Sequence, residues 1–376
     1  MKSKTLIALL ISLLSSCSFF KSKQYENDIV GEWIYAKTDD YRVLHYYNGL
    51  LEPPTLFEKR VNGFIFYKDK SCENKLGYYR AELDKTNHER RIVYLGNKTK
   101  YKFENDSLKI WDISDSTWQS LFIYSIIGDT MTIKTADSCF HKYTRTKYNI
   151  DTNERYDNIV VSSSGCYGYC PVMDIRIDKS GDVLFFGERF NTQYGFYSSK
   201  ISKQEYQNIE TNFKKADIKN LNERYYSEGT DRETISILFI KNDSIVKSIE
   251  DYGGKSPIEL IWAYTPLRFL YQNIKLTPLK SDNPKLNIRD ISIKNGDNIC
   301  SLSKAESYFL ATDIYRGKIT SRKLELKYKI EYWNAKRKKE IGYTDGQFYK
   351  IGVDTIDIGH NFLAKNKMTI KFNSEK

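Results

Sequence analysis

The chain is short of the residue types and motifs on which most metal sites and known catalytic sites depend. Among its 376 residues there are only four histidines, His45, His88, His141 and His360, and none lies near another in the sequence. A histidine-rich metal site is therefore not expected. The sequence also has no Gly-x-Gly-x-x-Gly, phosphate-loop, Gly-x-Ser-x-Gly or His-Glu-x-x-His motif. We therefore predict no catalytic residue, no metal site and no cofactor from motifs.

Long apolar runs are scarce as well, and the only one lies at the N-terminus. Together with a mean hydropathy of −0.58, this excludes a membrane protein with several spanning helices. Hydrophobic residues still make up 40% of the chain, which is enough to build cores and excludes wholesale disorder. The length predicts two or three domains. The formal net charge of +11 favours an anionic partner, such as a lipid headgroup, a glycan or a nucleic acid.

The N-terminal segment has the features of an export signal. Lys2 and Lys4 precede an apolar stretch, Leu6 to Leu14, that is short for a membrane span. The residues Leu14-Ser15-Ser16-Cys17 resemble the lipobox of bacterial lipoproteins. This resemblance implies cleavage before Cys17, a diacylglyceryl group on its thiol and an acyl chain such as palmitate on the new amine.

Acyl chains on Cys17 predict a stable membrane anchor. Residues 1–16 are then the signal peptide, and the polar residues 17–27 form a tether to the first domain. Ser18 in place of an aspartate resembles lipoproteins of the outer membrane, and the lack of an acidic run after Cys17 favours its periplasm-facing leaflet over the cell surface. That compartment argues against a nucleic-acid partner. The alternative is an ordinary signal peptide in which Cys17 is accidental.

Residues 28–146 show the pattern of a β-barrel. Short strand-like segments alternate with Asn-Gly, Gly-Asn and Gly-Asp turns, which predicts seven or eight strands in a barrel or sandwich. The segment Gly31-Glu32-Trp33 resembles the Gly-x-Trp strand of lipocalins and of lipocalin-like domains in Bacteroidetes lipoproteins. The resemblance implies that Arg145, on the last strand, packs over Trp33 and closes the barrel floor. The alternative is a buried Trp33 on the first strand of another β-fold.

A polar linker, residues 147–157, leads to a second domain at 158–279 in which strand patterns alternate with helix signals. Ser202 and Glu205 form a capping box that starts one helix. Pro257 is expected at the first position of another helix, which should bend or stop at Pro266. This domain is therefore predicted to be α+β.

Residues 285–376 are predicted to form a small β-rich module with one helix. That helix starts at a capping box of Ser303 and Glu306 and ends at Gly317, and alternating strand patterns follow. The predicted fold class is mainly β with α+β. It combines an N-terminal lipocalin-like β-barrel, a central α+β domain and a small β-rich C-terminal module.

The most specific motif beyond the signal is Gly165-Cys166-Tyr167-Gly168-Tyr169-Cys170-Pro171, between two predicted strands. In an oxidising compartment, Cys166 and Cys170 are expected to form a structural disulfide. A thiol–disulfide exchanger or a metal-binding pair is the alternative, although the spacing differs from the Cys-x-x-Cys of thioredoxin-like proteins. With Thr230-Asp231, the motif resembles a domain of unknown function in Bacteroidetes lipoproteins, and this resemblance implies no activity.

The remaining cysteines are harder to assign. Cys72 and Cys139 both fall in the barrel region and are a second candidate disulfide. Pairing them leaves Cys300 alone, and an odd cysteine in an exported protein is either buried or reactive. Because Cys300 sits in the apolar segment Asn298–Leu302, we predict that it is buried.

Tyrosine is unusually abundant, with 30 residues. Lysine, asparagine and isoleucine are abundant too, and tyrosine suits half-buried strands, so we interpret its abundance as compositional bias combined with β structure. Adjacent tyrosines, such as those at 225–226, point to opposite faces of any strand. The sequence therefore predicts no continuous platform of tyrosine rings.

Together these features predict a lipoprotein of the outer membrane that binds a ligand or another envelope component and is not an enzyme. The ligand is expected to be a small apolar molecule inside the barrel or an envelope glycan. The barrel interior is equally consistent with a filling of Trp33, Phe64, Phe66 and Tyr94 side chains.

The competing hypothesis is an enzyme. It places a thiol-redox or hydrolytic site at Cys166, Cys170 and Asp231, since these residues can supply sulfur chemistry and a carboxylate. A turn-stabilising role for Asp231 is the alternative that needs no catalysis.

Overall fold

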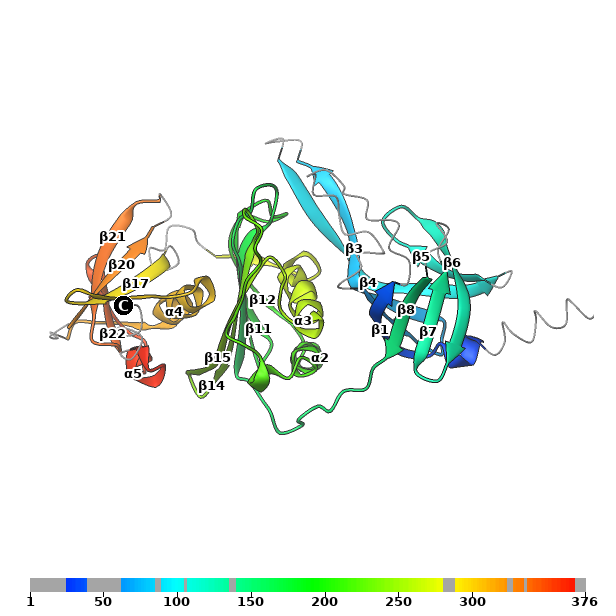
Figure 1. Cartoon of the computed structure of the whole chain (residues 1–376). Coiled ribbons are helices and arrows are strands. Elements are labelled where there is room, and N and C mark those ends of the chain that lie inside the picture. Colours follow the sequence, from blue (N-terminus) through cyan, green and yellow to red (C-terminus); the bar gives the residue numbers. More distant parts are fainter. Residues whose placement is uncertain are drawn as a thin grey trace, which may run out of the picture. The chain divides into compact units, whose positions relative to one another are not determined.

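The computed structural model describes residues 25–38, 62–84, 89–104, 107–134, 140–279, 288–322, 327–334 and 337–368. These residues form two compact units (Figure 1), the first within 1–81 and 93–149 and the second within 82–92 and 150–376. The predicted signal peptide, Cys17 and Cys139 lie outside the described residues. Across the part of the chain that is described, no helix is long and apolar enough to cross a bilayer.

Eight strands close into a barrel in the first unit, which confirms the prediction of a mainly-β fold with a barrel. Each strand neighbours the next in chain order, and β1 closes the ring by pairing with β8 in antiparallel register. The strands are β1 (Gly31–Thr38), β2 (Gly63–Phe66), β3 (Ser71–Leu83), β4 (Arg90–Glu104), β5 (Ser107–Asp112), β6 (Thr117–Ile127), β7 (Thr130–Lys134) and β8 (Phe140–Arg145).

The barrel interior is filled with the protein's own side chains. Alternate residues of a strand point inward, as on β5, where Leu108 and Ile110 are fully buried and Lys109 between them points outward. Aromatic rings fill the centre of the same core cluster. The fully buried aromatic residues are Trp33, Phe64, Phe66 and Tyr143, joined by the almost fully buried Tyr101. Tyr94, the fourth predicted filling residue, is buried against the ring of Tyr79.

Trp33 and Arg145, the predicted barrel-closing pair, are register partners on β1 and β8. The guanidinium carbon of Arg145 lies 4.3 Å from the centroid of the Trp33 ring. Arg145 also donates to the backbone carbonyls of Val30 and Asp28, and Trp33 Nε1 donates to the carbonyl of Ile29 at 2.6 Å. Gly31 has a φ of +138°, and a Cβ there would lie 2.6 Å from Arg145 Nη1. The Gly-x-Trp spacing therefore makes room for the arginine.

The second unit contains an eight-stranded sheet with the strand order β13-β15-β14-β9-β10-β11-β12-β16. Helices α2 (Lys203–Lys214) and α3 (Ile258–Arg268) cover one face of this central sheet, as Figure 1 shows. The strands are β9 (Asn158–Ser163), β10 (Val172–Asp178), β11 (Asp182–Arg189), β12 (Gly195–Lys200), β13 (Arg224–Tyr225), β14 (Thr234–Lys241), β15 (Ser244–Tyr252) and β16 (Thr277–Pro278). Short 3-10 helices follow α2 and α3 at η1 (Ile218–Asn220) and η2 (Leu270–Gln272).

The helix signals of this region were mostly correct. The capping box of Ser202 and Glu205 starts α2, which confirms that prediction. The prediction for α3 was wrong about Pro257, which is the residue before the helix. Pro266 lies inside the helix, which ends two residues later at Arg268. Pro266 has no N–H to donate to the carbonyl one turn earlier, so the helix loses one hydrogen bond shortly before it ends at Arg268.

A second sheet follows, with seven strands in the order β18-β17-β20-β21-β22-β23-β19. Its helices are α4 (Lys304–Arg316), which starts at the predicted capping box of Ser303 and Glu306, and α5 (Phe362–Lys365). The strands are β17 (Arg289–Asn295), β18 (Asn298–Ser301), β19 (Lys318–Thr320), β20 (Tyr328–Trp333), β21 (Lys339–Thr344), β22 (Phe348–Ile351) and β23 (Asp354–Asp357). Helix α4 ends at Gly317 as predicted. The backbone φ of Gly317 is −67°, which any residue can adopt. Glycine is needed here because a Cβ would lie only 2.5 Å from Cγ2 of Ile356.

Helix α4 is buried between the two sheets of the second unit. It packs against β9, β10 and β14 of the central sheet and against β17 of the following one. Its residues Phe309, Leu310 and Ile314 share one core cluster with Val160 and Leu238 of the central sheet. The regions 158–279 and 288–368 are thus joined by a common hydrophobic core rather than by a linker alone.

Charged residues on β10 pair with α4 across this core. Asp174, Arg176 and Asp178 alternate along the strand and therefore point to the same face of the sheet. Asp174 pairs with Lys304 at 3.0 Å, Arg176 with Asp313 at 2.6 Å, and Asp178 with Arg316 at 3.8 Å. These three ion pairs fix which turns of α4 meet which residues of the strand.

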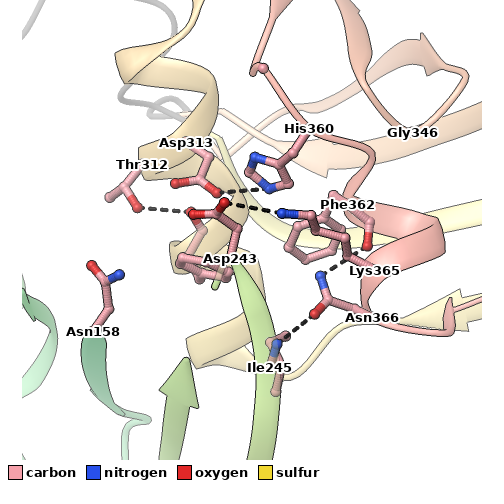
Figure 2. A network of polar contacts seen from close by, with 12 residues as sticks. Asn158, Asp243, Ile245, Thr312, Asp313, Gly346, His360, Phe362, Lys365 and Asn366 are labelled. Carbon is pink, nitrogen blue, oxygen red and sulfur yellow. Dashed lines mark hydrogen bonds and ion pairs between the residues drawn. The ribbon is translucent and has the colours of Figure 1, made fainter. Parts of the chain in front are cut away.

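Arg176 is the centre of this network. Its guanidinium donates to Asn158 Oδ1, Thr312 Oγ1 and Asp313 Oδ1 at 2.9, 2.6 and 2.6 Å, and it lies 4.6 Å from the ring centroid of Phe309. Figure 2 shows His360 beside Asp313, and its Nε2 lies 3.5 Å from Asp313 Oδ2. The carboxylate of Asp313 therefore lies beside two nitrogen-bearing side chains, Arg176 of β10 and His360 of the segment before α5.

Helix α5 is held to the central sheet by a second set of polar contacts, also visible in Figure 2. Lys365 Nζ lies 3.0 Å from the carboxylate of Asp243, in the turn between β14 and β15. The backbone N–H of Ile245 donates to Asn366 Oδ1 at 2.6 Å. The C-terminal part of the chain therefore contacts the central sheet at both α4 and α5.

Replacing Arg176 by methionine is expected to destabilise the second unit by about 3–5 kcal/mol, because the buried Asp313 carboxylate then loses its main counter-charge. The measurement is equilibrium urea unfolding of the wild-type and Arg176→Met chains, followed by circular dichroism.

Two variants complete this experiment. Lys200→Met breaks an exposed ion pair with Asp182 and should cost less than about 1 kcal/mol. The double variant Arg176→Met with Asp313→Asn removes both charges and should recover part of the lost stability. Equal losses for Arg176→Met and Lys200→Met would contradict the importance of the buried pair.

Candidate functional site

Several turns of the central sheet meet at one of its ends. Strands β9 and β11 finish there, and β10, β12 and β14 begin there, because these neighbours are antiparallel. Strand β13 runs parallel to β15, so both finish at this end as well. The turns that gather are 164–171, 190–194, 226–233 and 253–257. The Cys166–Cys170 motif therefore lies in a row of turns that come from distant parts of the sequence.

The motif forms a short turn closed by a disulfide between Cys166 and Cys170, whose Cα atoms are 5.7 Å apart. The hydroxyl of Ser163 donates to the carbonyl of Pro171 at 2.5 Å and holds the two ends of the turn together. Tyr167, at the tip, is 84% exposed. The turn thus presents an aromatic ring to solvent on a backbone that is covalently restrained.

Further aromatic rings surround this turn. The rings of Tyr226 and Tyr252 stack with centroids 5.0 Å apart and an interplanar angle of 17°, and Tyr226 is 76% exposed. Tyr169 makes an edge-to-face contact with Phe190, at 5.4 Å between centroids. We call these five residues, Tyr167, Tyr169, Phe190, Tyr226 and Tyr252, the tyrosine end of the sheet.

Backbone hydrogen bonds link the Cys turn to the stacked pair. The N–H of Tyr167 donates to the carbonyl of Asp231 at 2.9 Å, and the N–H of Arg232 donates to the hydroxyl oxygen of Tyr252 at 3.2 Å. Asp231 has a φ of +63°, a conformation that aspartate tolerates better than most residues. These two bonds hold the C-terminal end of the segment 226–232, and the stacking of Tyr226 on Tyr252 holds its other end.

A buried carboxylate fixes the loop next to the tyrosine end. Asp251, at the end of β15, is fully buried and accepts hydrogen bonds from both backbone N–H groups of Lys255 and Ser256, from the Ser256 hydroxyl and from the Tyr264 hydroxyl. Burial, with the nearby Asp251 charge, raises the pKa of Tyr264 well above its usual value. Its phenol therefore stays protonated and can donate to Asp251. This network fixes the loop that follows the stacked Tyr252.

A paired arginine lies close to the same loop. Arg268 of α3 forms a bidentate pair with Glu233, with nitrogen–oxygen distances of 3.0 and 2.6 Å. Glu233 directly precedes β14, and its backbone carbonyl accepts from the N–H of Gly253. Helix α3 thus holds the strand ends on which the tyrosine end is built.

The structure brings Asp231 to the Cys166–Cys170 turn through its backbone carbonyl, whereas its exposed side chain accepts from the neighbouring Thr230 hydroxyl at 3.3 Å. This is the geometry of a turn-stabilising residue. The described residues contain no group of three or more histidine, cysteine, aspartate or glutamate side chains that could hold a metal ion.

The other described cysteines, Cys72 and Cys300, are buried in hydrophobic cores. Cys72 is fully buried in the barrel core, and burial raises the pKa of its thiol to about 12, so the thiol stays protonated at neutral pH. Its candidate partner, Cys139, is outside the described residues. Cys300 is 1% exposed and belongs to the core that surrounds α4, which confirms the predicted burial.

One known family matches the central region of the chain. Residues 157–271 match the family described as a domain of unknown function, DUF6438. This confirms that a domain of unknown function lies here, and the match spans β9 to α3 and therefore the whole tyrosine end. No curated protein and no solved structure matches the chain.

Sequence reasoning missed the tyrosine end. It treated the tyrosines at 225–226 as a pair on opposite faces of a strand, but the strand β13 ends at Tyr225 and Tyr226 lies in the turn. The partners Tyr167 and Tyr252 are distant in sequence, and no local pattern indicates that they meet. The exposed Tyr-Gly-Tyr inside the Cys166–Cys170 motif was the available signal.

Replacing both Cys166 and Cys170 by serine should lower the free energy of unfolding by about 2 kcal/mol, since the loop that the disulfide closes is short. A local effect should accompany it, because the turn no longer holds the Tyr167 N–H against the Asp231 carbonyl. Amide hydrogen exchange at Tyr167 is the readout and should become faster in the variant. Unchanged exchange would mean that the hydrogen bonds alone fix the turn.

Proposed function

We propose that this protein is a lipid-anchored envelope protein that binds a glycan at the tyrosine end of its central sheet. The observation that carries the proposal is the group of exposed rings on a restrained backbone. Tyr167 and Tyr226 are largely exposed, although burial of such rings would be favourable. Exposed aromatic clusters of this kind mark interaction sites, and loops on a rigid sheet are where binding residues concentrate.

The chemistry of a sugar suits this surface. The C–H faces of a pyranose ring are apolar and stack on tyrosine rings, while its hydroxyl groups hydrogen-bond to polar neighbours and to tyrosine hydroxyls. Arg232 supplies a cation next to the stacked pair, since its side chain lies against Gly253, directly after Tyr252. The fixed loops lower the conformational entropy that binding costs.

The barrel is a weaker candidate for ligand binding. Trp33, Phe64, Phe66 and Tyr143 occupy its core, which favours a structural role for the lipocalin-like fold that we propose for it. The alternative of a thiol-redox or hydrolytic enzyme at Cys166, Cys170 and Asp231 has less support, because Asp231 meets the turn through its backbone.

The glycan proposal is tested with purified peptidoglycan sacculi and an array of bacterial polysaccharides. The wild-type chain should be retained by at least one of these probes. Tyr167→Ala with Tyr226→Ala should weaken retention about tenfold or more, since each lost aromatic contact is worth about 0.5–1.5 kcal/mol beyond its buried area.

A matched control variant is Tyr343→Ala, which removes an exposed tyrosine from β21 in the other sheet. It should bind like the wild type. The proposal fails if no probe retains the wild-type chain, or if the double variant binds as tightly as Tyr343→Ala.

The anchor is a separate part of the proposal and rests on the lipobox-like residues Leu14-Ser15-Ser16-Cys17. Cells grown with an alkyne analogue of palmitate should label the wild-type protein, and Cys17→Ala should abolish the label because the acylated residue is gone. Cys300→Ala is the control cysteine variant and should keep the label. Labelled Cys17→Ala protein would contradict the anchor.

A further inference from the structure

The outer surface of the barrel carries a second group of exposed aromatic residues, separate from the tyrosine end. Trp111 and Trp118 are half-buried and lie directly opposite each other on β5 and β6, with ring centroids 5.4 Å apart. Further along β6, Phe122 and Tyr124 are 45% and 57% exposed, and Ile127 is 75% exposed. Leu121 and Ile123 alternate with Phe122 and Tyr124 and are buried in the core. A register shift after Ile123 then turns Ile126 toward the core and leaves Ile127 exposed. The row therefore belongs to the outer face and is not needed to fill the barrel.

Lysine side chains make cation–π contacts with these rings. Lys100 Nζ lies 4.9 Å from the ring centroid of Trp111 and 5.5 Å from that of Trp118, and Lys102 Nζ lies 4.7 Å from the Trp118 centroid. On the other side of β6, Lys134 lies 5.8 Å from the Phe140 ring. Cations and aromatic rings are thus mixed across neighbouring strands.

We call this surface the cation–aromatic face. It consists of Lys100, Lys102, Lys109, Trp111, Trp118, Phe122, Tyr124, Ile127, Lys134 and Phe140. Glu104 lies among these residues and pairs with Lys102 and Lys109. The face therefore keeps an excess of positive charge.

The chain enters the barrel beside this face. Arg145 binds the backbone of residues 28–30 and also lies 3.3 Å from Asp129, in the turn between β6 and β7. The Tyr25 hydroxyl donates to the backbone carbonyl of Tyr124 at 3.4 Å. Tyr25, the first described residue, thus contacts the backbone of β6 while packing against the barrel core, so a tether that starts at Cys17 would reach the barrel beside β6.

We propose that the cation–aromatic face binds the surface of a bilayer through anionic phospholipid headgroups. Lysines attract an anionic headgroup layer, and tryptophan and tyrosine rings prefer the boundary between headgroups and acyl chains. Exposed aliphatic and aromatic side chains, such as Ile127 and Phe122, enter that boundary when the lysines hold the barrel against it.

A membrane surface fits this face better than a single sugar or peptide does. The lysines and rings are spread over the outer side of five neighbouring strands, β4 to β8. A planar, anionic surface can contact such a face at many points at once. The inference is independent of glycan binding, because its residues lie on the barrel.

The test uses the chain from residue 18 onward, which lacks Cys17 and keeps every described residue. Its sedimentation is measured with vesicles of phosphatidylcholine alone and with vesicles that also contain phosphatidylglycerol. We expect binding only when phosphatidylglycerol is present, and we expect it to weaken as salt is added. Because this chain has no anchor, its result is separate from that of the palmitate experiment.

Lys100→Gln with Lys102→Gln should lower the vesicle partition coefficient about tenfold or more, since each lysine near an anionic surface contributes strongly to binding. The matched control is Lys203→Gln with Lys350→Gln, which removes the same charge from exposed positions of the second unit. The control should change binding less than twofold. Equal losses in the two double variants would overturn the proposal, because they would indicate an effect of net charge alone.

Tryptophan fluorescence gives an independent readout of contact. Phosphatidylglycerol with brominated acyl chains should quench the wild-type protein, since Trp111 and Trp118 lie on the face. Quenching should be reduced in Phe122→Ser with Tyr124→Ser, whose substitutions are at exposed positions outside the core. Absence of quenching, or equal binding to vesicles without phosphatidylglycerol, would overturn the proposal.

Discussion

The burial of α4 between two sheets is the constraint on which the second unit depends. A helix enclosed on both sides must bury polar groups as well as apolar ones, and each buried charge needs a partner. Arg176 meets this need by contacting Asp313, Thr312 and Asn158 at once. A buried ion pair adds little net stability over an apolar pair, but breaking it is costly. Its effect is to select one alignment of α4 on β10.

The position of α4 also affects which surfaces of the central sheet are covered and which remain accessible. Helices α2 and α3 pack on one face and α4 packs on the other. The turns at the sheet ends remain accessible. The Cys166–Cys170 disulfide, the buried Asp251 and the pair of Arg268 with Glu233 all restrain the turns at one end. The exposed tyrosines therefore lie on turns that are restrained by covalent and polar contacts.

The barrel shows a similar division between a closed interior and a chemically distinct exterior. Its core is filled by aromatic rings, and its floor is closed by Arg145 over Trp33. Lysines and aromatic residues remain on the outer side of β4 to β8. The chain therefore has two separate groups of partly exposed aromatic residues, one on the barrel and one on the central sheet, and we propose a membrane surface for the first and a glycan for the second.

The amino-acid sequence by itself determined the features that depend on neighbouring residues. Gly31, Trp33 and Arg145 indicated the barrel floor, the capping boxes at Ser202 and Ser303 marked helix starts, and the spacing of Cys166 and Cys170 indicated a closed turn. Only the tertiary structure decided that α4 joins the two sheets and that Tyr167, Tyr226 and Tyr252 share one sheet end. The physical reason is that alternation along a strand shows which side chains are buried. It does not show which strands become neighbours, and the order β13-β15-β14-β9-β10 brings distant turns together.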